Sequence, residues 1–232
     1  MISTPVFFAS AGAAAAAAFL AIRRMPSEAA ARRFARAFWI ATVVLAAASF
    51  VSSAGRSLKV LPAGLVRPLA VELLGYRFFV PLGVATAAAA LAAPARRHAA
   101  RRAFVLSPRV RGALRLSIAL AYLGVEIGKL THEAEMREFF VGSGLPAWMN
   151  PAVIASETVL AAALFWPATE IVAAAGLSFI MAGAILTHAH NGDPFSDSLE
   201  ALHMLGLLVG FAVLTLAARG REVAMSGIPS RA

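Results

Sequence analysis

Four polar residues fall on one face of a predicted apolar helix in the second half of the chain. Tyr122, Glu126, Lys129 and Glu133 are spaced by four, three and four residues, which places their side chains on the same side of a helix. Ionisable groups inside a membrane are costly and usually face the interior of a helix bundle. Glu126 and Lys129 can also form an i,i+3 ion pair whose only role is to reduce the cost of burial.

A further carboxylate and several histidines are expected at a similar depth. Glu157 lies six residues after Pro151, where the next apolar run begins, and therefore roughly 9 Å along that helix. Histidines stand near the ends of the neighbouring runs. We expect one layer of ionisable groups, which comprises Glu126, Lys129, His132, Glu157, His188, His190 and His203.

Carboxylates and imidazoles together can bind a metal, ligate haem or exchange protons with a quinone. His188 and His190 are about 200° apart on a helix, so both cannot face one centre unless the helix has ended. A di-metal bundle needs two Glu-x-x-His pairs, and only Glu200 with His203 supplies one. Interfacial histidines with satisfied hydrogen bonds remain the alternative, and we predict no metal site.

The candidate site residues fall into two groups by predicted role. The catalytic candidates are Glu126, Lys129 and Glu157. The cofactor-binding candidates are Tyr122, His132, His188 and His203. The sequence does not decide the cofactor, for which a quinone and haem are both open.

Long apolar runs must position these residues. Hydrophobic residues make up 60% of the 232 residues, and mean hydropathy is +0.77, above the roughly 45–50% apolar share of soluble domains. Each run is close to the length for one membrane crossing. The predicted crossings are 5–22, 37–53, 78–93, 113–130, 152–166, 171–187 and 201–218. We predict an all-α polytopic membrane bundle of about seven helices, of which the third and fifth have the weakest patterns.

Arginine and lysine residues separate between alternate connections, as they do when cytoplasmic loops retain positive charge. Fifteen of the 21 lie in the first connection, the third connection with the start of the following helix, and the C-terminal tail. This bias predicts an N-terminus outside and a C-terminus in the cytoplasm of a bacterial inner membrane. The first run is followed by Arg23 and Arg24 and has no positive residue before it, which favours a spanning helix over a cleaved signal.

The arginine-rich stretch 95–115 is the longest polar interruption. It predicts a three-helix membrane subdomain over residues 1–112 and a four-helix membrane subdomain over residues 113–232. Gly206 and Gly210 have the spacing that allows close helix contact in membranes, and we interpret them as packing residues.

Composition excludes several function classes. The absence of cysteine rules out resident disulfides, thiol redox chemistry and iron–sulfur clusters. The basic residues that give the chain its net charge of +9 lie between apolar runs without interleaved aromatic residues. This arrangement argues against nucleic-acid binding. A retinal protein needs a lysine on its last helix, and residues 201–218 contain none.

The second half resembles the DoxX-like family over about residues 113–218. The resemblance rests on short motifs in a matching order, at Gly128-Lys129-Leu130, Phe139-Phe140, Ser143-Gly144-Leu145-Pro146, Glu157 and His188. It implies a four-helix membrane bundle, and it places the chain in the setting of bacterial quinone-linked oxidoreductase assemblies. The three additional N-terminal helices depart from the usual size of the family.

Three functions follow as hypotheses. The first is a component or accessory of a quinone-linked redox system, with a polar pocket near the outer leaflet and other subunits as partners. The second is a proton-coupled small-solute transporter or channel, in which the same charges line a pathway. The third is a structural subunit of a larger membrane complex. The sequence leaves open whether a reaction occurs and whether the chain forms a homo-oligomer.

Overall fold

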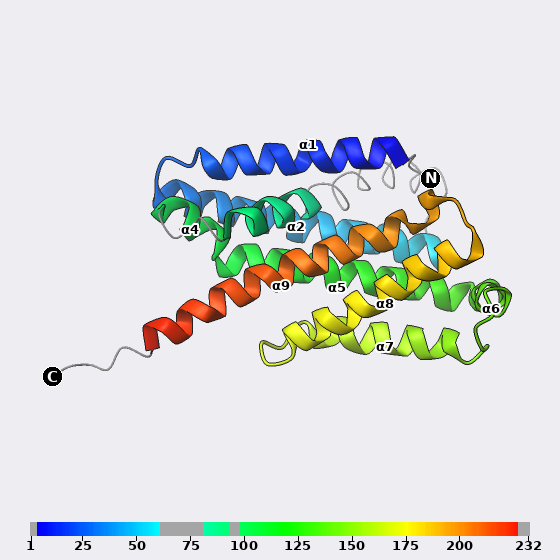
Figure 1. Ribbon diagram of the computed structural model, residues 1–232. Coiled ribbons are helices and arrows are strands. Elements are labelled where there is room, and N and C mark those ends of the chain that lie inside the picture. Colours follow the sequence, from blue (N-terminus) through cyan, green and yellow to red (C-terminus); the bar gives the residue numbers. More distant parts are fainter. Residues whose placement is uncertain (1–3, 61–80, 93–97, 227–232) are drawn as a thin grey trace.

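The chain folds as a bundle of long α-helices (Figure 1). The structure is a computed structural model and describes residues 4–60, 81–92 and 98–226. The described elements, in chain order, are α1 (Thr4–Arg23), α2 (Glu28–Ser57), a short helix at Pro81–Ala92, α4 (Ala99–Val105), α5 (Pro108–Thr131), α6 (Glu133–Gly142), α7 (Met149–Ala163), α8 (Glu170–Asn191), the 3₁₀ turn η2 (Phe195–Ser198) and α9 (Leu199–Ser226). The all-α prediction is therefore confirmed.

Each predicted apolar run overlaps a helix. Helices α1, α2, α5, α8 and α9 extend beyond their runs at both ends, whereas α7 ends at Ala163, three residues before the end of the predicted crossing 152–166. Four helices are long and apolar enough to cross a membrane by length and composition: α1, residues 28–55 of α2, α8, and residues 195–220, which comprise η2 and most of α9. The helix at Pro81–Ala92 and α7, with 15 residues, are shorter, and α5 carries more charged residues. Part of the predicted third crossing, residues 78–80 and 93, lies outside the described residues. The count of seven crossings stays a prediction.

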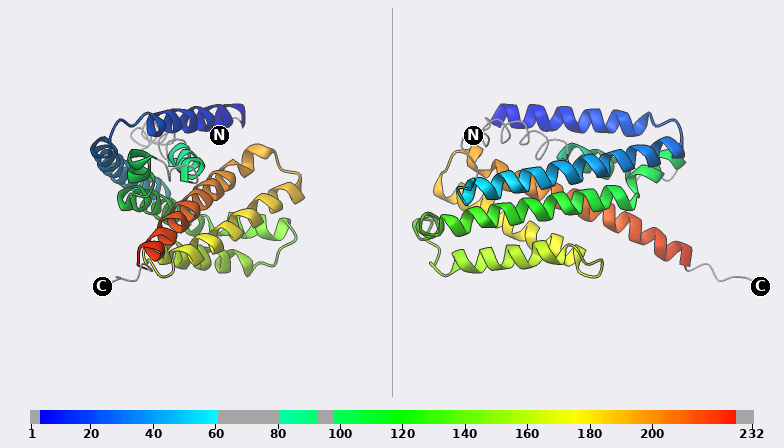
Figure 2. Two further views of the ribbon diagram at one scale, coloured as in Figure 1. Left: turned by 60° about the vertical axis from the view of Figure 1, so that its left-hand side comes forward. Right: turned by 180° about the vertical axis from the view of Figure 1, so that it is seen from behind.

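Helices α2, α5 and α7 lie side by side, with α5 between α2 and α7 (Figure 2). The pair α2 and α5 makes the most extensive helix contact. Glycines on α5 allow it: the position of a Cβ at Gly124 would be 3.6 Å from Ser53, and at Gly112 it would be 3.0 Å from the ring of Trp39. Small residues at such seams let helices associate where lipid supplies no hydrophobic driving force.

Helix α9 crosses the bundle and packs against α8, α5 and the helix at Pro81–Ala92 (Figure 1). The position of a Cβ at Gly206 would be 2.8 Å from Leu82, and at Gly210 it would be 2.7 Å from the Cβ of Ala85. The two glycines therefore act in packing, as predicted. A single apolar core joins α9 to both halves of the chain, including Phe104 and Leu208.

Helix α5 begins at Pro108, four residues before the end of the predicted N-terminal subdomain. Its start is fixed by Ser107, whose Oγ accepts a hydrogen bond from the backbone N–H of Arg109, and by proline in the first turn. The division into subdomains 1–112 and 113–232 remains a prediction.

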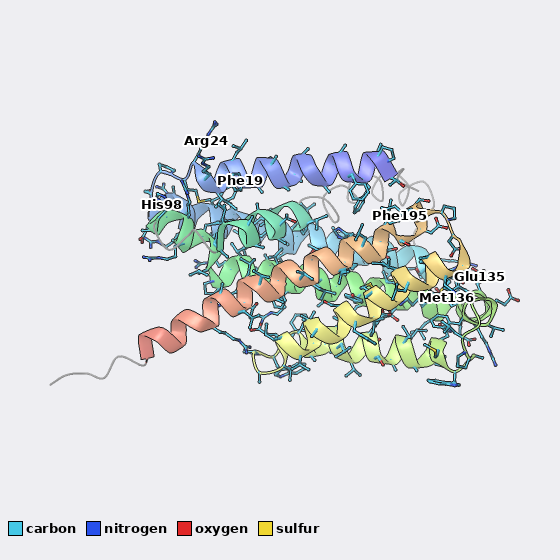
Figure 3. All side chains as sticks on the ribbon, viewed as in Figure 1. Phe19, Arg24, His98, Glu135, Met136 and Phe195 are labelled. Carbon is cyan, nitrogen blue, oxygen red and sulfur yellow. The ribbon has the colours of Figure 1, made fainter. Side chains whose placement is uncertain are left out.

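The two ends of the bundle differ in composition. Arg24 and His98 lie at one end, and Glu135, Met136 and Phe195 lie at the other (Figure 3). The starts of α4 and α5 reach the first of these ends, where Arg101 Nε donates to the backbone oxygen of Arg23 at 3.2 Å. We call this the arginine-rich end. The end that carries α6 and η2 is called the α6 end.

Candidate functional site: a buried ion cluster between α5 and α7

Two glutamates and a lysine meet between α5 and α7. Lys129 Nζ donates a hydrogen bond to Glu157 Oε2 and lies 2.9 Å from Glu126 Oε1. The glutamates are almost fully buried, at 3% and 1% side-chain exposure, while the lysine is 22% exposed. We call Glu126, Lys129 and Glu157 the ion cluster. The three predicted catalytic candidates are therefore neighbours.

The sequence brings these groups together through helix periodicity. On α7, Asn150, Ile154, Glu157 and Ala161 are buried, and their spacings of four, three and four residues define one face. On α5, Tyr122 and Glu126 are one turn apart and buried. Because α5 and α7 pack together, the polar residues of both faces are enclosed between apolar neighbours.

The ion cluster has two carboxyl groups and one ammonium group. Ionisation of both carboxyl groups would give it a net charge of −1. Breaking a buried ion pair by removing one partner typically costs about 3–5 kcal/mol, because the other charge is left without compensation. The cluster therefore attracts a proton, a cation or a hydrogen-bond donor.

Glu126 is paired with Lys129, whose Nζ lies 2.9 Å from Oε1, but its buried carboxylate has no well-oriented hydrogen bond among the described residues. The hydroxyl of Tyr122, one turn further from the α6 end, is likewise buried without a hydrogen bond in the described part of the chain. Native proteins rarely leave such groups unsatisfied, so these atoms are available to a ligand or to water.

Asn150 is a third group of this kind and was not predicted from the sequence. It is 1% exposed, and both polar atoms of its amide lack a hydrogen bond within the described residues. It lies on the face of α7 that carries Glu157, seven residues closer to the α6 end, or about 10 Å. The sequence feature that could have indicated Asn150 is its seven-residue spacing from Glu157, at the start of a short apolar helix.

The structure places His188 with other partners. Its Nδ1 lies 2.8 Å from Asp193 Oδ2, and its ring packs on Phe139 with centroids 5.3 Å apart. Asn191 donates a hydrogen bond to Ser143 Oγ at 2.8 Å. These contacts join the end of α8 to α6 and form a second group around His188, which we call the His188 cluster. The single layer of ionisable groups stays a prediction.

The other histidines have different surroundings. His132 ends α5, where its exposed ring donates from Nδ1 to the backbone oxygen of Gly128 at 3.0 Å. Helix α8 continues to Asn191, so His188 and His190 point in different directions and His190 is exposed. His203 is buried on α9 at 1% exposure. Within the described residues no group of three or more His, Asp or Glu side chains is placed to hold a metal ion.

The predicted polar face of α5 is shorter than expected. Helix α5 ends at Thr131, and the exposed Glu133 begins α6. Helix α6 is seen end-on in Figure 1 because it runs across the end of the bundle. Tyr122, Glu126 and Lys129 therefore remain as the polar face that α5 presents within the bundle.

A second ion cluster, in which the carboxylate is buried and the two arginines are partly exposed, was also missed. Glu170, at the start of α8, lies 2.9 Å from Arg219 Nη2 and 3.5 Å from Arg115 Nη1. Arg219 also donates to the backbone oxygen of Pro167. This cluster ties α5, α8 and α9 together at the ends opposite α6. The only sequence signal was an acidic residue directly before an apolar run, together with one arginine near the end of an earlier helix and one near the end of a later helix.

Comparison with known proteins bears on the segment that contains the ion cluster. Residues 113–218 match the DoxX-like family. The predicted resemblance is thus confirmed over the predicted residues, which make up just under half of the chain. This DoxX-like segment contains the ion cluster, Asn150, His188 and His203. Together with the apolar helices it identifies an integral membrane protein. No curated protein and no solved structure matches the chain.

The motifs behind the resemblance have two kinds of role. Gly144 has a positive φ angle of 75°, a region that glycine adopts without steric cost, and it follows the end of α6, as Gly192, outside those motifs, does for α8 with a φ angle of 73°. Lys129 and Glu157 form the ion cluster instead. The DoxX-like segment therefore combines residues that shape its turns with residues that place charge in its interior.

Proposed function

We propose that the DoxX-like segment forms a site for a quinone head group and acts in a quinone-linked redox system as a component or accessory. The observation that carries the proposal is the ion cluster, in which two buried glutamates share one lysine between apolar helices. Charged groups at such positions usually mark ion or proton pathways and substrate sites.

The chemistry of the ion cluster suits this role. A quinone takes up two electrons and two protons when it becomes a quinol. Neighbouring carboxyl groups can deliver or accept these protons. Lys129 would orient these carboxyl groups through hydrogen bonds. The electrons would come from, or pass to, a redox subunit that binds this chain. Glu126 and Glu157 would exchange protons, and Tyr122 would hydrogen-bond the head group.

The placement of the histidines favours a quinone head group over haem. Of the four histidines in or beside the DoxX-like helices, His188 is held by Asp193 and His132 caps a helix. His190 is exposed. His203 is the buried imidazole, and we propose that it contributes to the environment of the head group from α9.

The orientation of the chain follows from charge. Arginines gather at one end of the bundle, and the ion cluster lies nearer to the α6 end. Positive residues favour the cytoplasmic side. We therefore propose an inner-membrane protein whose N-terminus faces outward, whose C-terminus faces the cytoplasm, and whose head-group site lies toward the outer leaflet.

Equilibrium binding to the detergent-purified full chain tests the proposal. We expect a short-chain ubiquinone or menaquinone analogue to bind, and Glu157→Gln to weaken binding by about tenfold, since a charge-assisted hydrogen bond contributes about 1.5–3 kcal/mol. His188→Ala is the matched control from the His188 cluster and should change the dissociation constant less than about twofold. Absence of binding by the wild-type chain would defeat the proposal.

Proton-coupled transport is the second candidate. The observation that favours it is the presence of buried ion clusters toward both ends of α5, with Lys129 in one and Arg115 in the other. Such an arrangement could alternate access between the two sides. Proton uptake by proteoliposomes in response to a solute, without quinone binding, would favour transport over the quinone site.

A further inference from the structure

The arginine-rich end carries more positive charge than the residues around it balance. Residues 23–36 and 98–111 contain nine arginines and one acidic residue, Glu28. Glu28 pairs with Arg32 at 3.2 Å. In the described part of the chain, none of the other eight arginines forms an ion pair with a carboxylate. This charge is therefore left for an anion from outside the chain.

The arginines lie on helices that are held together, and this arrangement favours binding. The fully buried ring of Phe104 on α4 packs against Phe34 of α2, with ring centroids 5.3 Å apart. Arg101 of α4 donates from Nε to the backbone oxygen of Arg23, at the end of α1, at 3.2 Å. Helix α4 thus contacts both α1 and α2. Groups held in place in this way lose less conformational entropy when they bind a ligand.

Membrane geometry places this end at the level of the lipid head groups. Helix α1 has 20 residues and is therefore about 30 Å long, which matches the hydrocarbon core of a bilayer. Its last residue is Arg23, and Arg24 follows at the end of the bundle that also carries His98 (Figure 3). An α1 that spans the membrane brings both guanidinium groups to the depth of the lipid phosphates.

Exposed apolar residues continue from the arginines along the same helices. On α2, Ile40 lies four residues after Arg36 and Val44 four residues further, with exposures of 52% and 60%. On α1, Leu20 is 45% exposed and lies three residues before Arg23. Residues at these spacings share a helix face. A phospholipid has its phosphate and its acyl chains in the same order, whereas free phosphate would leave the apolar face uncovered.

We propose that the arginine-rich end is a binding site for anionic phospholipids, whose phosphate groups pair with Arg23, Arg24, Arg101 and Arg102. Guanidinium groups suit this ligand because their planar donors can bind two phosphate oxygens at once. Each basic residue near an anionic lipid surface changes affinity by about fivefold. A bound lipid would bridge α1 and α4 and stabilise their contact. The site is separate from the ion cluster and does not depend on the proposed function.

Thermal unfolding of the detergent-purified full chain tests the inference. Phosphatidylglycerol, phosphatidylcholine or inorganic phosphate is added at one concentration. A ligand that binds the folded protein raises its melting temperature. We expect phosphatidylglycerol to raise it by about 3–6 °C and the other two by less than about 1 °C.

The double variant Arg24→Gln/Arg102→Gln removes two of the proposed contacts. Neither side chain forms an ion pair or a hydrogen bond within the described residues, so the fold does not depend on them. We expect the variant to bind phosphatidylglycerol about thirtyfold more weakly and to lose most of the rise in melting temperature. Arg137→Gln is the matched control, because Arg137 is also exposed but lies on α6, and it should keep the full rise.

Three results would overturn the inference. The first is equal stabilisation of the wild-type chain by the two phospholipids. The second is a rise with inorganic phosphate as large as that with phosphatidylglycerol, which would contradict a lipid ligand. The third is an equal loss of the response in Arg137→Gln and in the double variant.

Native mass spectrometry of the wild-type chain provides a second measurement if the double variant does not fold. From an equimolar mixture, phosphatidylglycerol should stay bound in preference to phosphatidylcholine. Equal retention of the two lipids would contradict the proposed site. Each of these results leaves the proposed function of the ion cluster unaffected.

Discussion

Lys129 is the residue on which the burial of two carboxylates depends. It is one of two lysines in the chain, and it compensates Glu126 and Glu157 at the same time. Its own aliphatic stem is mostly enclosed, so the residue contributes both charge and packing. At this scale, the sequence identified the right residue types because glutamate and lysine are costly inside an apolar helix and occur there mainly where they pair or act.

Replacing Lys129 tests its contribution to the stability of the protein. Lys129→Met keeps the length of the side chain and removes the charge, which leaves two buried glutamates facing each other. We expect a loss of about 3–5 kcal/mol in the free energy of unfolding, as for a broken buried ion pair, measured by thermal unfolding in detergent. Lys59→Met is the control, because Lys59 is exposed beyond the end of α2. Equal effects of the two substitutions would contradict the assigned role.

Helix contacts in this bundle depend on positions without side chains. Helix α9 approaches the helix at Pro81–Ala92 at Gly206 and Gly210. Since both lipid and the bundle core are apolar, hydrophobicity does not tell the two faces of such a helix apart. The contact surface follows instead from the places where small residues allow close approach.

Adding one methyl group should therefore have opposite effects at two glycines. In Gly210→Ala, the new Cβ would lie 2.7 Å from the Cβ of Ala85 and 3.3 Å from its backbone carbon, and overpacking of this kind costs about 1–3 kcal/mol. We expect the melting temperature to fall by roughly 2–10 °C.

Gly183→Ala on α8 is the matched control, because nothing lies within 4 Å of its added Cβ. Alanine is favoured over glycine in a helix by about 1 kcal/mol, so this variant should be as stable as the wild type or more stable. A larger loss at Gly183 than at Gly210 would refute the packing described here.

Sequence reasoning recovered the elements better than their contacts. The apolar runs predicted the long helices because a hydrocarbon layer requires them. Helix α6 was not predicted, since its ten residues mix charges with Phe139 and Phe140 and resemble a polar connection. The α2–α5 seam was also missed, because nothing in either helix alone indicates which partner its small residues face.

The candidate site was predicted in part for a related reason. Periodicity on α5 placed Tyr122, Glu126 and Lys129 on one face, and depth along α7 brought Glu157 to them. Depth alone could not tell that His188 would pair with Asp193, five residues later, because that contact depends on how Gly192 ends α8. Asn150 and Glu170 escaped notice because one residue stands at the start of an apolar helix and the other directly before an apolar run, where polar residues are common.

At the scale of the whole molecule, two ion clusters with buried carboxyl groups connect the helices of the second half of the chain, one toward each end of the bundle. Arg115, Glu170 and Arg219 connect α5, α8 and α9, while the Glu126–Lys129–Glu157 cluster connects α5 and α7. The first cluster pairs one carboxylate with two arginines. The second has two carboxyl groups and one lysine, and this difference is the reason to propose ligand binding at the second.

The most direct test of that assignment is photoaffinity labelling of the full chain in membranes with an azido-quinone, followed by mass spectrometry of its peptides. The account predicts adducts on residues 117–131 of α5 and 149–163 of α7, suppressed by an excess of unlabelled quinone. Adducts confined to α1, α2 or the arginine-rich end, or adducts that excess quinone does not suppress, would contradict it.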